Sequence, residues 1–145
     1  MQFRSVIPAT PAEVFAFHEL PDALDWLTPR WEHVRIIERA ADLRPGSRTV
    51  EMVRVMPLVW MRLEAVPTLY DPPHCFEDRQ VRGPFRRWYH RHIIEPHADG
   101  ALLIDDIDFR PPLTWLTGWF VRRRLRKLFA YRHRVTREYF FGGSG

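Results

Sequence analysis

The sequence predicts an α+β domain in which an antiparallel sheet packs against one long C-terminal helix. Two patterns support this prediction. Between residues 33 and 110, alternating polar and apolar segments follow one another with short turns and no helical pattern between them, which is typical of an antiparallel sheet. Residues 113–140 contain no proline and carry apolar side chains at helical spacing. A chain of 145 residues suits a single domain.

A strand and two short helices are expected first. Residues 2–8 alternate as a strand does. Thr10, Pro11 and Glu13 then form the pattern of a capping box, with Thr10 as the N-cap and Pro11 in the first helical position. A second short helix is expected over residues 21–27, and the Thr28-Pro29 pair ends it.

The middle of the chain is expected to supply the remaining strands of a sheet with about six or seven. Clusters of proline, glycine, aspartate and serine separate these strands and predict tight turns. The expected strands cover residues 33–39, 47–56, 58–66, 75–82, 85–96 and 101–110.

The last element is a helix over residues 113–140, about 42 Å long at a rise of about 1.5 Å per residue. It is the only element large enough to cover the apolar face of the sheet. Its expected apolar stripe consists of Leu116, Phe120, Leu128, Val135 and Tyr139. Residues 1–141 are therefore expected to form one domain, followed by a flexible Gly/Ser tail at 142–145 that can be a remnant of expression.

The composition excludes several classes of protein. The single cysteine, Cys75, excludes a disulfide framework and a multi-thiolate zinc site. The net charge of +4 comes without a nucleic-acid-binding motif, and an aromatic content of 14% favours a large apolar core or cavity, so no nucleic-acid partner is expected. The longest uncharged stretch, 111–121, is too short to span a bilayer. No signal-peptide pattern opens the chain, so a cytoplasmic location is expected.

Strand alternation predicts a polar cluster on one face of the sheet. The side chains assigned to the inward face lie on three consecutive strands, and they are Phe76, Asp78, Gln80, Trp88, His90, His92, Leu103, Asp105, Ile107 and Phe109. Among them, Asp78, His90, His92 and Asp105 are expected to converge as candidate catalytic or ligand-orienting groups. A carboxylate beside a histidine would raise the histidine pKa. The alternative, that these groups only satisfy one another across the sheet, stays open.

Four segments resemble the SRPBCC or START-like superfamily, which includes the polyketide cyclase/dehydrase-like and birch-pollen-allergen-like proteins. They are IPATPAEVFAFHELPDALDWLTPRW, LRPGSRT, FEDRQVRGPFRRWYHRH and IDDIDFRPPL. The pattern is similar to a bacterial branch of ligand-binding SRPBCC domains. The resemblance implies a helix-grip fold, in which a curved sheet wraps around the C-terminal helix and encloses a cavity. It implies little about function, because members of the superfamily do unrelated things.

Binding of a small hydrophobic or aromatic ligand in that cavity is the first functional hypothesis. The residues expected to line the cavity are His18, Trp60, Phe76, Gln80, Trp88, Ile107, Phe109 and Trp115. The second hypothesis is a cyclase/dehydrase-type enzyme that uses a His–Asp acid/base pair on a polyketide-like substrate. The third is lipid or membrane-surface handling by the aromatic and basic residues 113–127. The sequence leaves open whether the chain forms a homodimer.

A metal is not expected, although His90 and His92 with a carboxylate have the composition of a two-histidine, one-carboxylate site. Rieske-type oxygenase domains share the broader fold, but their ligands follow a helix-based spacing that this sequence lacks. No cofactor is expected either, because the chain has neither a P-loop nor a glycine-rich dinucleotide fingerprint.

Overall fold

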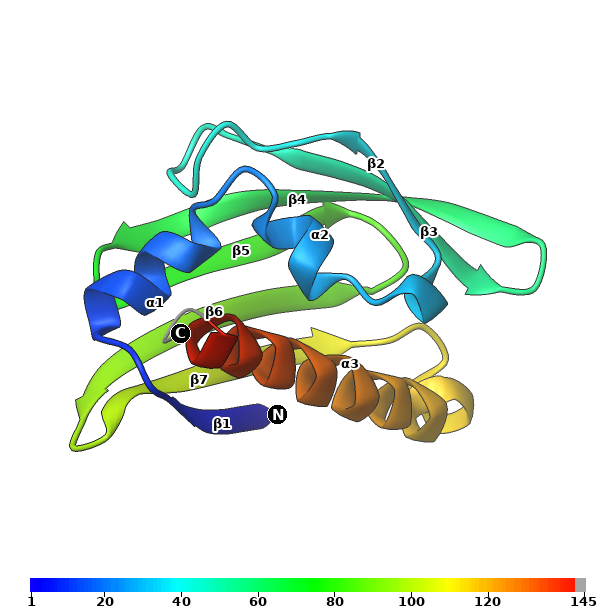
Figure 1. The fold of residues 1–145 in the computed structure, drawn as a ribbon. Coiled ribbons are helices and arrows are strands. Elements are labelled where there is room, and N and C mark those ends of the chain that lie inside the picture. Colours follow the sequence, from blue (N-terminus) through cyan, green and yellow to red (C-terminus); the bar gives the residue numbers. More distant parts are fainter. Residues whose placement is uncertain (143–145) are drawn as a thin grey trace.

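A computed structural model describes residues 1–142 and contains one seven-stranded antiparallel sheet with the strand order β1-β7-β6-β5-β4-β3-β2. Figure 1 shows the sheet curving around the long helix α3, with the short helices α1 and α2 beside it on the same face. The strands are β1 Gln2–Ile7, β2 Val34–Glu38, β3 Thr49–Met56, β4 Val59–Asp71, β5 Cys75–Arg82, β6 Arg87–His97 and β7 Gly100–Arg110. The helices are α1 Pro11–His18, α2 Ala23–Leu27, the 3-10 helix η1 Arg30–Glu32, and α3 Thr114–Gly142.

This architecture confirms the fold expected from the sequence, with differences at some boundaries. Strand β4 continues to Asp71, whereas the pattern predicted an end at Val66. Pro67 cannot donate a ladder hydrogen bond, and the structure accommodates it with a register shift between Pro67 and Leu69. The 3-10 helix η1 was not predicted. Gly142 belongs to α3, and the rest of the expected tail lies outside the described residues.

Helix α1 forms as the capping-box pattern predicts. The Thr10 amide donates to the Glu13 carboxylate at 2.8 Å, and the Glu13 amide donates to the Thr10 hydroxyl at 3.3 Å. The helix packs Val14 and Phe15 into a core cluster on the sheet. It ends at His18, whose side chain is buried.

Helix α3 packs against β1 and β7 through a face that differs from the predicted stripe. The residues it buries are Gly118, Leu125, Phe129, His133 and Thr136. The predicted stripe was wrong at Leu116, Phe120 and Tyr139, which are exposed. Apolar residues occur all around this helix, so their spacing does not single out the face that packs on the sheet.

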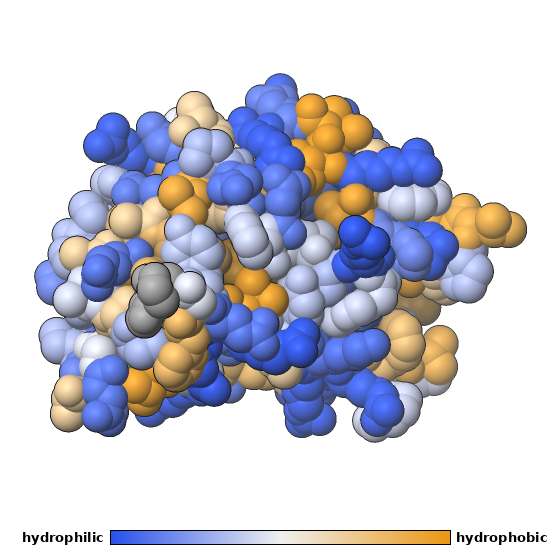
Figure 2. Space-filling model, in the orientation of Figure 1, coloured by the Kyte–Doolittle hydropathy of each residue, from blue (hydrophilic) through white to orange (hydrophobic). Residues whose placement is uncertain are grey.

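The first turns of α3 leave their large apolar side chains exposed. Trp115 and Trp119 are 85% and 73% exposed, and Leu58 at the tip of the β3–β4 hairpin is 95% exposed. Figure 2 shows apolar areas over this hairpin tip and over the start of α3, both at the right-hand end of the molecule. We call these residues, with Leu116 and Phe120, the apolar end. Within residues 1–142, no helix combines the length and the apolar character needed to cross a membrane.

Candidate functional site

A pocket of about 360 Å³ lies on the concave face of the sheet, bounded by α1, α2, α3 and the strands β3 to β6. Its apolar wall includes Leu24, Leu27, Leu63, Ala65, Phe76 and Trp88. Its polar lining includes His18, Glu51, Asp78, His90, His92 and Arg132. The lining therefore combines a largely apolar wall with several polar groups, which is the usual composition of a small-molecule site.

Asp105 lies behind the polar part of the pocket lining and orients two histidines. The Nε2–H of His90 donates to Asp105 Oδ1 at 2.8 Å, and the Nε2–H of His133 donates to Asp105 Oδ2 at 2.7 Å. His133 reaches Ser5 on β1 with its other ring nitrogen, Nδ1, at 2.8 Å. Because a carboxylate only accepts hydrogen bonds, Asp105 sets the proton position and the orientation of both imidazoles.

The electrostatic balance at Asp105 favours its ionised form. Asp105 is 3% exposed, and burial alone would raise its pKa. The charge of His92 and the hydrogen bonds from His133 and His90 outweigh burial and hold the pKa of Asp105 well below its usual range. The cluster is thus built around a buried carboxylate that carries a negative charge.

The register of the sheet explains why these groups meet. Asp78 on β5 is paired with His90 on β6, and His92 on β6 is paired with Asp105 on β7. Alternate residues of one strand share a face, so His90 and His92 point to the same side. His133 joins them from α3, because it lies on the buried face of that helix.

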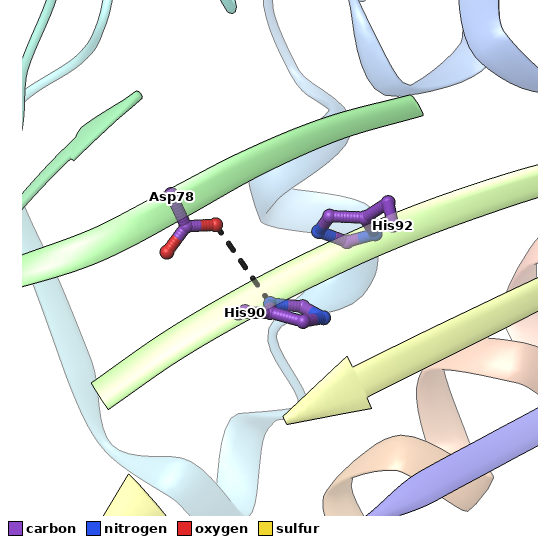
Figure 3. Close-up of side chains that lie close together, drawn as sticks. All are labelled: Asp78, His90 and His92. Atoms are coloured by element: carbon purple, nitrogen blue, oxygen red, sulfur yellow. Dashed lines mark ion pairs between the residues drawn. The ribbon is translucent and has the colours of Figure 1, made fainter. Parts of the chain in front are cut away.

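Asp78 faces His90 from the open side of the pocket. Its Oδ2 lies 3.7 Å from His90 Nδ1, and Figure 3 shows the carboxylate and both imidazoles gathered over adjacent strands. The side chain of Asp78 retains 31% exposure, whereas that of His90 retains 4%. Burial raises the pKa of Asp78 to about 6.

His92 is packed tightly but lacks a hydrogen bond at Nδ1. Its ring stacks on Phe76 with centroids 4.0 Å apart, and the His90 centroid is 3.9 Å away. His92 Nδ1 lies 2.8 Å from Asp105 Oδ1, but the direction of approach does not make a hydrogen bond. This buried atom therefore has no hydrogen-bond partner among residues 1–142, although it lies within ion-pair distance of Asp105. Burial lowers the pKa of His92, and the neighbouring His90 adds to this shift.

His18 forms the edge of the cluster at the end of α1. Its Nδ1–H donates to the Val14 carbonyl at 2.8 Å, and its ring lies 5.3 Å from that of His92. Burial and the charge of His92 lower the pKa of His18 to about 3. His18 is therefore neutral near pH 7, so it can line an apolar pocket without an unpaired charge.

The structure brings together seven of the residues singled out in the sequence, six of them in the pocket lining and Asp105 directly behind it. The six in the lining are His18, Phe76, Asp78, Trp88, His90 and His92. These positions follow from strand alternation on β5, β6 and β7, together with the end of α1.

The other five predicted residues lie away from the pocket. Trp60 is partly buried under the Arg35 guanidinium, 4.6 Å from its ring centroid. Ile107 and Phe109 pack in the core cluster around Phe129 instead of lining the hollow. These residues support the sheet and α3.

Gln80 lies at the β5–β6 turn and Trp115 lies on the surface. The Gln80 amide donates to the Phe85 carbonyl at 2.6 Å and accepts from the Phe85 amide at 3.2 Å, so it closes the β5–β6 turn. Trp115 belongs to the apolar end and is almost fully exposed.

Sequence reasoning missed several polar residues of the pocket lining and of the cluster behind it, including residues of α3 and β3. His133 and Arg132 lie on α3, and Glu51 lies on β3. The spacing of His133 four residues after Phe129 was the available signal, because residues four apart share a helix face. Only the docking of the helix shows that this face is the buried one.

Three side chains at the floor of the pocket have the composition of a metal site. Asp78, His90 and His92 each offer one ligand atom, and these atoms lie within 4.8 Å of one another. Two imidazoles and one carboxylate are ligands that divalent transition metals accept.

Solved structures share this fold at low sequence identity. The protein TTHA0849 from Thermus thermophilus is 16% identical with a TM-score of 0.68, over 100% of this chain and 99% of that one. Ara h 8.0201 is 13% identical with a TM-score of 0.65, over 94% and 95% of the two chains. The di-domain ARO/CYC StfQ from the steffimycin biosynthetic pathway is 11% identical with a TM-score of 0.74, over 100% of this chain and 52% of StfQ. These similarities confirm the START-like fold implied by the sequence.

Comparison with protein families adds one match. Residues 66–140, which include β5, β6, β7 and most of α3, match the family described as "Domain of unknown function (DUF8410)". None of the curated proteins compared matches the sequence.

Proposed function

The chain belongs to the DUF8410 family, and we propose that it binds a small apolar or aromatic molecule in the pocket between the sheet and the helices. The observation that supports this proposal is the pocket itself, whose volume of about 360 Å³ lies within the range of small-molecule sites. Its wall is mostly apolar, and its polar lining includes Asp78, His90 and His92.

The polar floor gives the ligand an orientation. Asp78 and His90 present hydrogen-bonding atoms to the pocket, while Asp105 holds the His90 ring in place from behind. A ligand without a matching polar group would cover these atoms and leave them unpaired, at a cost of about 1–3 kcal/mol each. The His90 Nδ1 lone pair and the Asp78 carboxylate both accept hydrogen bonds, so the pocket should prefer an apolar or aromatic molecule that carries a hydroxyl or another hydrogen-bond donor at one end.

The test fills the pocket without touching its polar groups. In Ala65→Phe a large side chain replaces a small one on the pocket face of β4, whereas in Val66→Phe the change falls on the opposite face of the same strand. The fluorescent probe 1-anilinonaphthalene-8-sulfonate should bind the native protein and Val66→Phe, and its affinity should fall at least tenfold in Ala65→Phe. Equal binding by all three folded proteins would contradict the proposal.

Native mass spectrometry provides a second readout. A ligand retained from the expression host should appear as a discrete added mass on the native chain and on Val66→Phe. It should be lost from Ala65→Phe. An added mass that persists in Ala65→Phe would place the ligand elsewhere.

A second candidate function is acid–base catalysis of the cyclase/dehydrase type. It is favoured by His90, whose Nε2–H is held by Asp105 while Nδ1 faces Asp78 and the pocket. A positioned imidazole contributes about 10²–10⁴-fold to proton-transfer reactions. His90→Ala should lower turnover of a polyketide-like carbonyl substrate by at least about 100-fold. Unchanged turnover in His90→Ala and His92→Ala would exclude this function.

Contact with an anionic membrane is a third candidate, favoured by the exposure of Trp115 and Trp119 next to basic residues of α3. The native protein should then co-sediment with vesicles containing anionic lipid and less with neutral vesicles. Trp115→Ser combined with Trp119→Ser should abolish this binding. Equal co-sedimentation with anionic and with neutral vesicles would contradict this candidate function.

A further inference from the structure

We propose that Asp78, His90 and His92 bind a divalent transition-metal ion such as Zn²⁺ at the floor of the pocket. The three side chains come from two adjacent strands, and their ligand atoms lie within 4.8 Å of one another. Figure 3 shows the Asp78 carboxylate directed at the His90 imidazole, with His92 beside it. This proposal does not depend on the proposed ligand, because the metal would bind to the chain alone.

The spacing of the first two ligand atoms suits one shared ion. Asp78 Oδ2 and His90 Nδ1 are 3.7 Å apart, which is longer than a hydrogen bond. An ion about 2.1 Å from each atom would see them at an angle of about 120°, close to the angles of four-coordinate zinc. The two side chains therefore need little movement to coordinate the same ion.

His90 is already oriented as a metal ligand. Its Nε2–H donates to Asp105 Oδ1 at 2.8 Å, so the lone pair lies on Nδ1, the atom that faces Asp78. Ligating histidines in proteins commonly donate their other N–H to a carboxylate, which fixes the tautomer and increases the basicity of the ligand. Asp105, held in turn by His133, supplies that support.

His92 supplies a second, independent observation. It is 7% exposed, and its Nδ1 has no hydrogen-bond partner among the described residues. An unpaired buried nitrogen costs about 1–3 kcal/mol. This nitrogen lies 2.8 Å from Asp105 Oδ1 without making a hydrogen bond, so a turn of the ring that brings it to an ion shared with Asp78 and His90 would give it a partner.

The charge and access of the site also suit a divalent cation. Asp78 and Asp105 place two carboxylates around the same imidazoles, and a divalent ion would balance them. All three proposed ligands line the pocket, so an ion can enter through it. Three protein ligands leave at least one coordination position for water or for a polar group of the bound molecule.

A metal at this position excludes the acid–base role of His90. The ion would occupy the Nδ1 lone pair that a general base needs, so only one of the two functions can operate in a given state of the protein. Binding of the apolar probe, in contrast, depends on the wall around Ala65 and remains testable if no metal binds.

The test measures metal binding to the full chain after dialysis against a chelator. Zn²⁺ is titrated in competition with a chromophoric chelator, and Co²⁺ is added separately to record its visible absorption. We expect one ion per chain and a Co²⁺ spectrum typical of four or five coordination. Asp78→Asn and His92→Phe should each weaken Zn²⁺ binding at least tenfold, and Asp105→Asn should weaken it about 10–100-fold as the support of a ligand.

Exposed histidines elsewhere provide the control. His97→Ala removes an imidazole at the end of β6, outside the pocket, and should bind Zn²⁺ as the native chain does. Circular dichroism establishes that each variant is folded. If His92→Phe fails to fold, the near-isosteric Asp78→Asn decides the question. Binding of less than one ion per chain, or unchanged affinity in folded Asp78→Asn, would overturn the proposal.

Discussion

At the level of single residues, Asp105 has the largest number of partners in the site. It accepts hydrogen bonds from His90 and His133 with separate oxygens and is almost fully buried. Removal of one partner from a buried charged network is costly, because the remaining groups lose their compensation. The stability of this protein should therefore depend on a residue that the pocket does not expose.

Asp105→Asn is expected to lower the free energy of unfolding by about 3 kcal/mol. The amide nitrogen cannot accept a hydrogen bond, so either His90 or His133 loses its acceptor. Urea unfolding followed by circular dichroism measures the change. Asp106→Asn, on the opposite face of the same strand, is the matched control and should change stability by less than about 0.5 kcal/mol. Equal effects of the two substitutions would contradict this role of Asp105.

His18 should make the metal-free protein less stable in mild acid. Burial lowers its pKa from 6.5 to about 3, so the unfolded chain binds this proton at a higher pH than the folded chain. Stability from His18 is therefore fully present above about pH 6.5 and is lost as the pH falls toward 3, by at most about 1.4 kcal/mol per pH unit. The free energy of unfolding, measured with urea at several pH values between 7 and 4, should fall less steeply with decreasing pH in His18→Phe than in the native protein.

The neighbouring buried residue Phe17 provides the control for this pH dependence. Phe17→Leu should lower stability at every pH without changing the slope, because neither side chain titrates. If His18→Phe keeps the slope of the native protein, another group is responsible for the acid sensitivity.

At the level of secondary-structure elements, α1 is the helix that carries His18 to the pocket. Its start is fixed by the reciprocal hydrogen bonds between Thr10 and Glu13. Thr10→Ala should therefore cost about 1 kcal/mol of stability, measured by urea unfolding. Thr10→Ser keeps a hydroxyl at the N-cap and should recover most of the loss. A full loss in Thr10→Ser would show that the methyl group, and not the cap, matters.

Much of the element order could be read from the sequence because its signals are local. The capping box at Thr10 and the turn residues around Gly46 and Gly100 act within a few positions of themselves, so they define boundaries without knowledge of the fold. Strand alternation likewise placed Asp78 and Asp105 on the pocket side. Pro67 shows the limit, because an irregularity in the pairing with β5 allows β4 to pass a residue that normally ends a strand.

The contribution of α3 could not be read in the same way. Its rotation about its own axis depends on how Phe129 stacks on Phe3, 5.0 Å away on β1, which is a contact between distant parts of the chain. His133 entered the site only through this docking. Trp60 and Trp115 were expected at the pocket because an aromatic side chain suits a cavity wall and a surface equally well. The sequence alone does not distinguish the two locations.

At the level of the whole molecule, the two ends of α3 differ in what they contribute to stability. The middle and end of the helix bury Phe129 and Thr136, whereas its start leaves Trp115 and Trp119 exposed. Exposed side chains outside special features contribute within about 0.5 kcal/mol, while burial of a phenylalanine contributes about 3–5 kcal/mol. The apolar end therefore contributes little to the stability of the described fold.

The combined substitution Trp115→Ser and Trp119→Ser should leave the free energy of unfolding within about 1 kcal/mol of the native value. Phe129→Ala should lower it by about 3–5 kcal/mol. Thermal or urea unfolding of the three proteins measures both effects. A large loss in the double variant would mean that the tryptophans pack on something in the folded protein, such as a second copy of the chain.

The two oxygens of Asp105 have a consequence for how the molecule can move. Oδ1 accepts a hydrogen bond from His90 of the sheet, and Oδ2 accepts one from His133 of α3. The Asp105 side chain thus links the helix to the sheet next to the polar residues of the pocket. Lifting the helix would break the hydrogen bond from His133 and leave the buried Asp105 carboxylate with the one from His90. The charge balance behind the pocket floor therefore depends on α3 staying docked on the sheet.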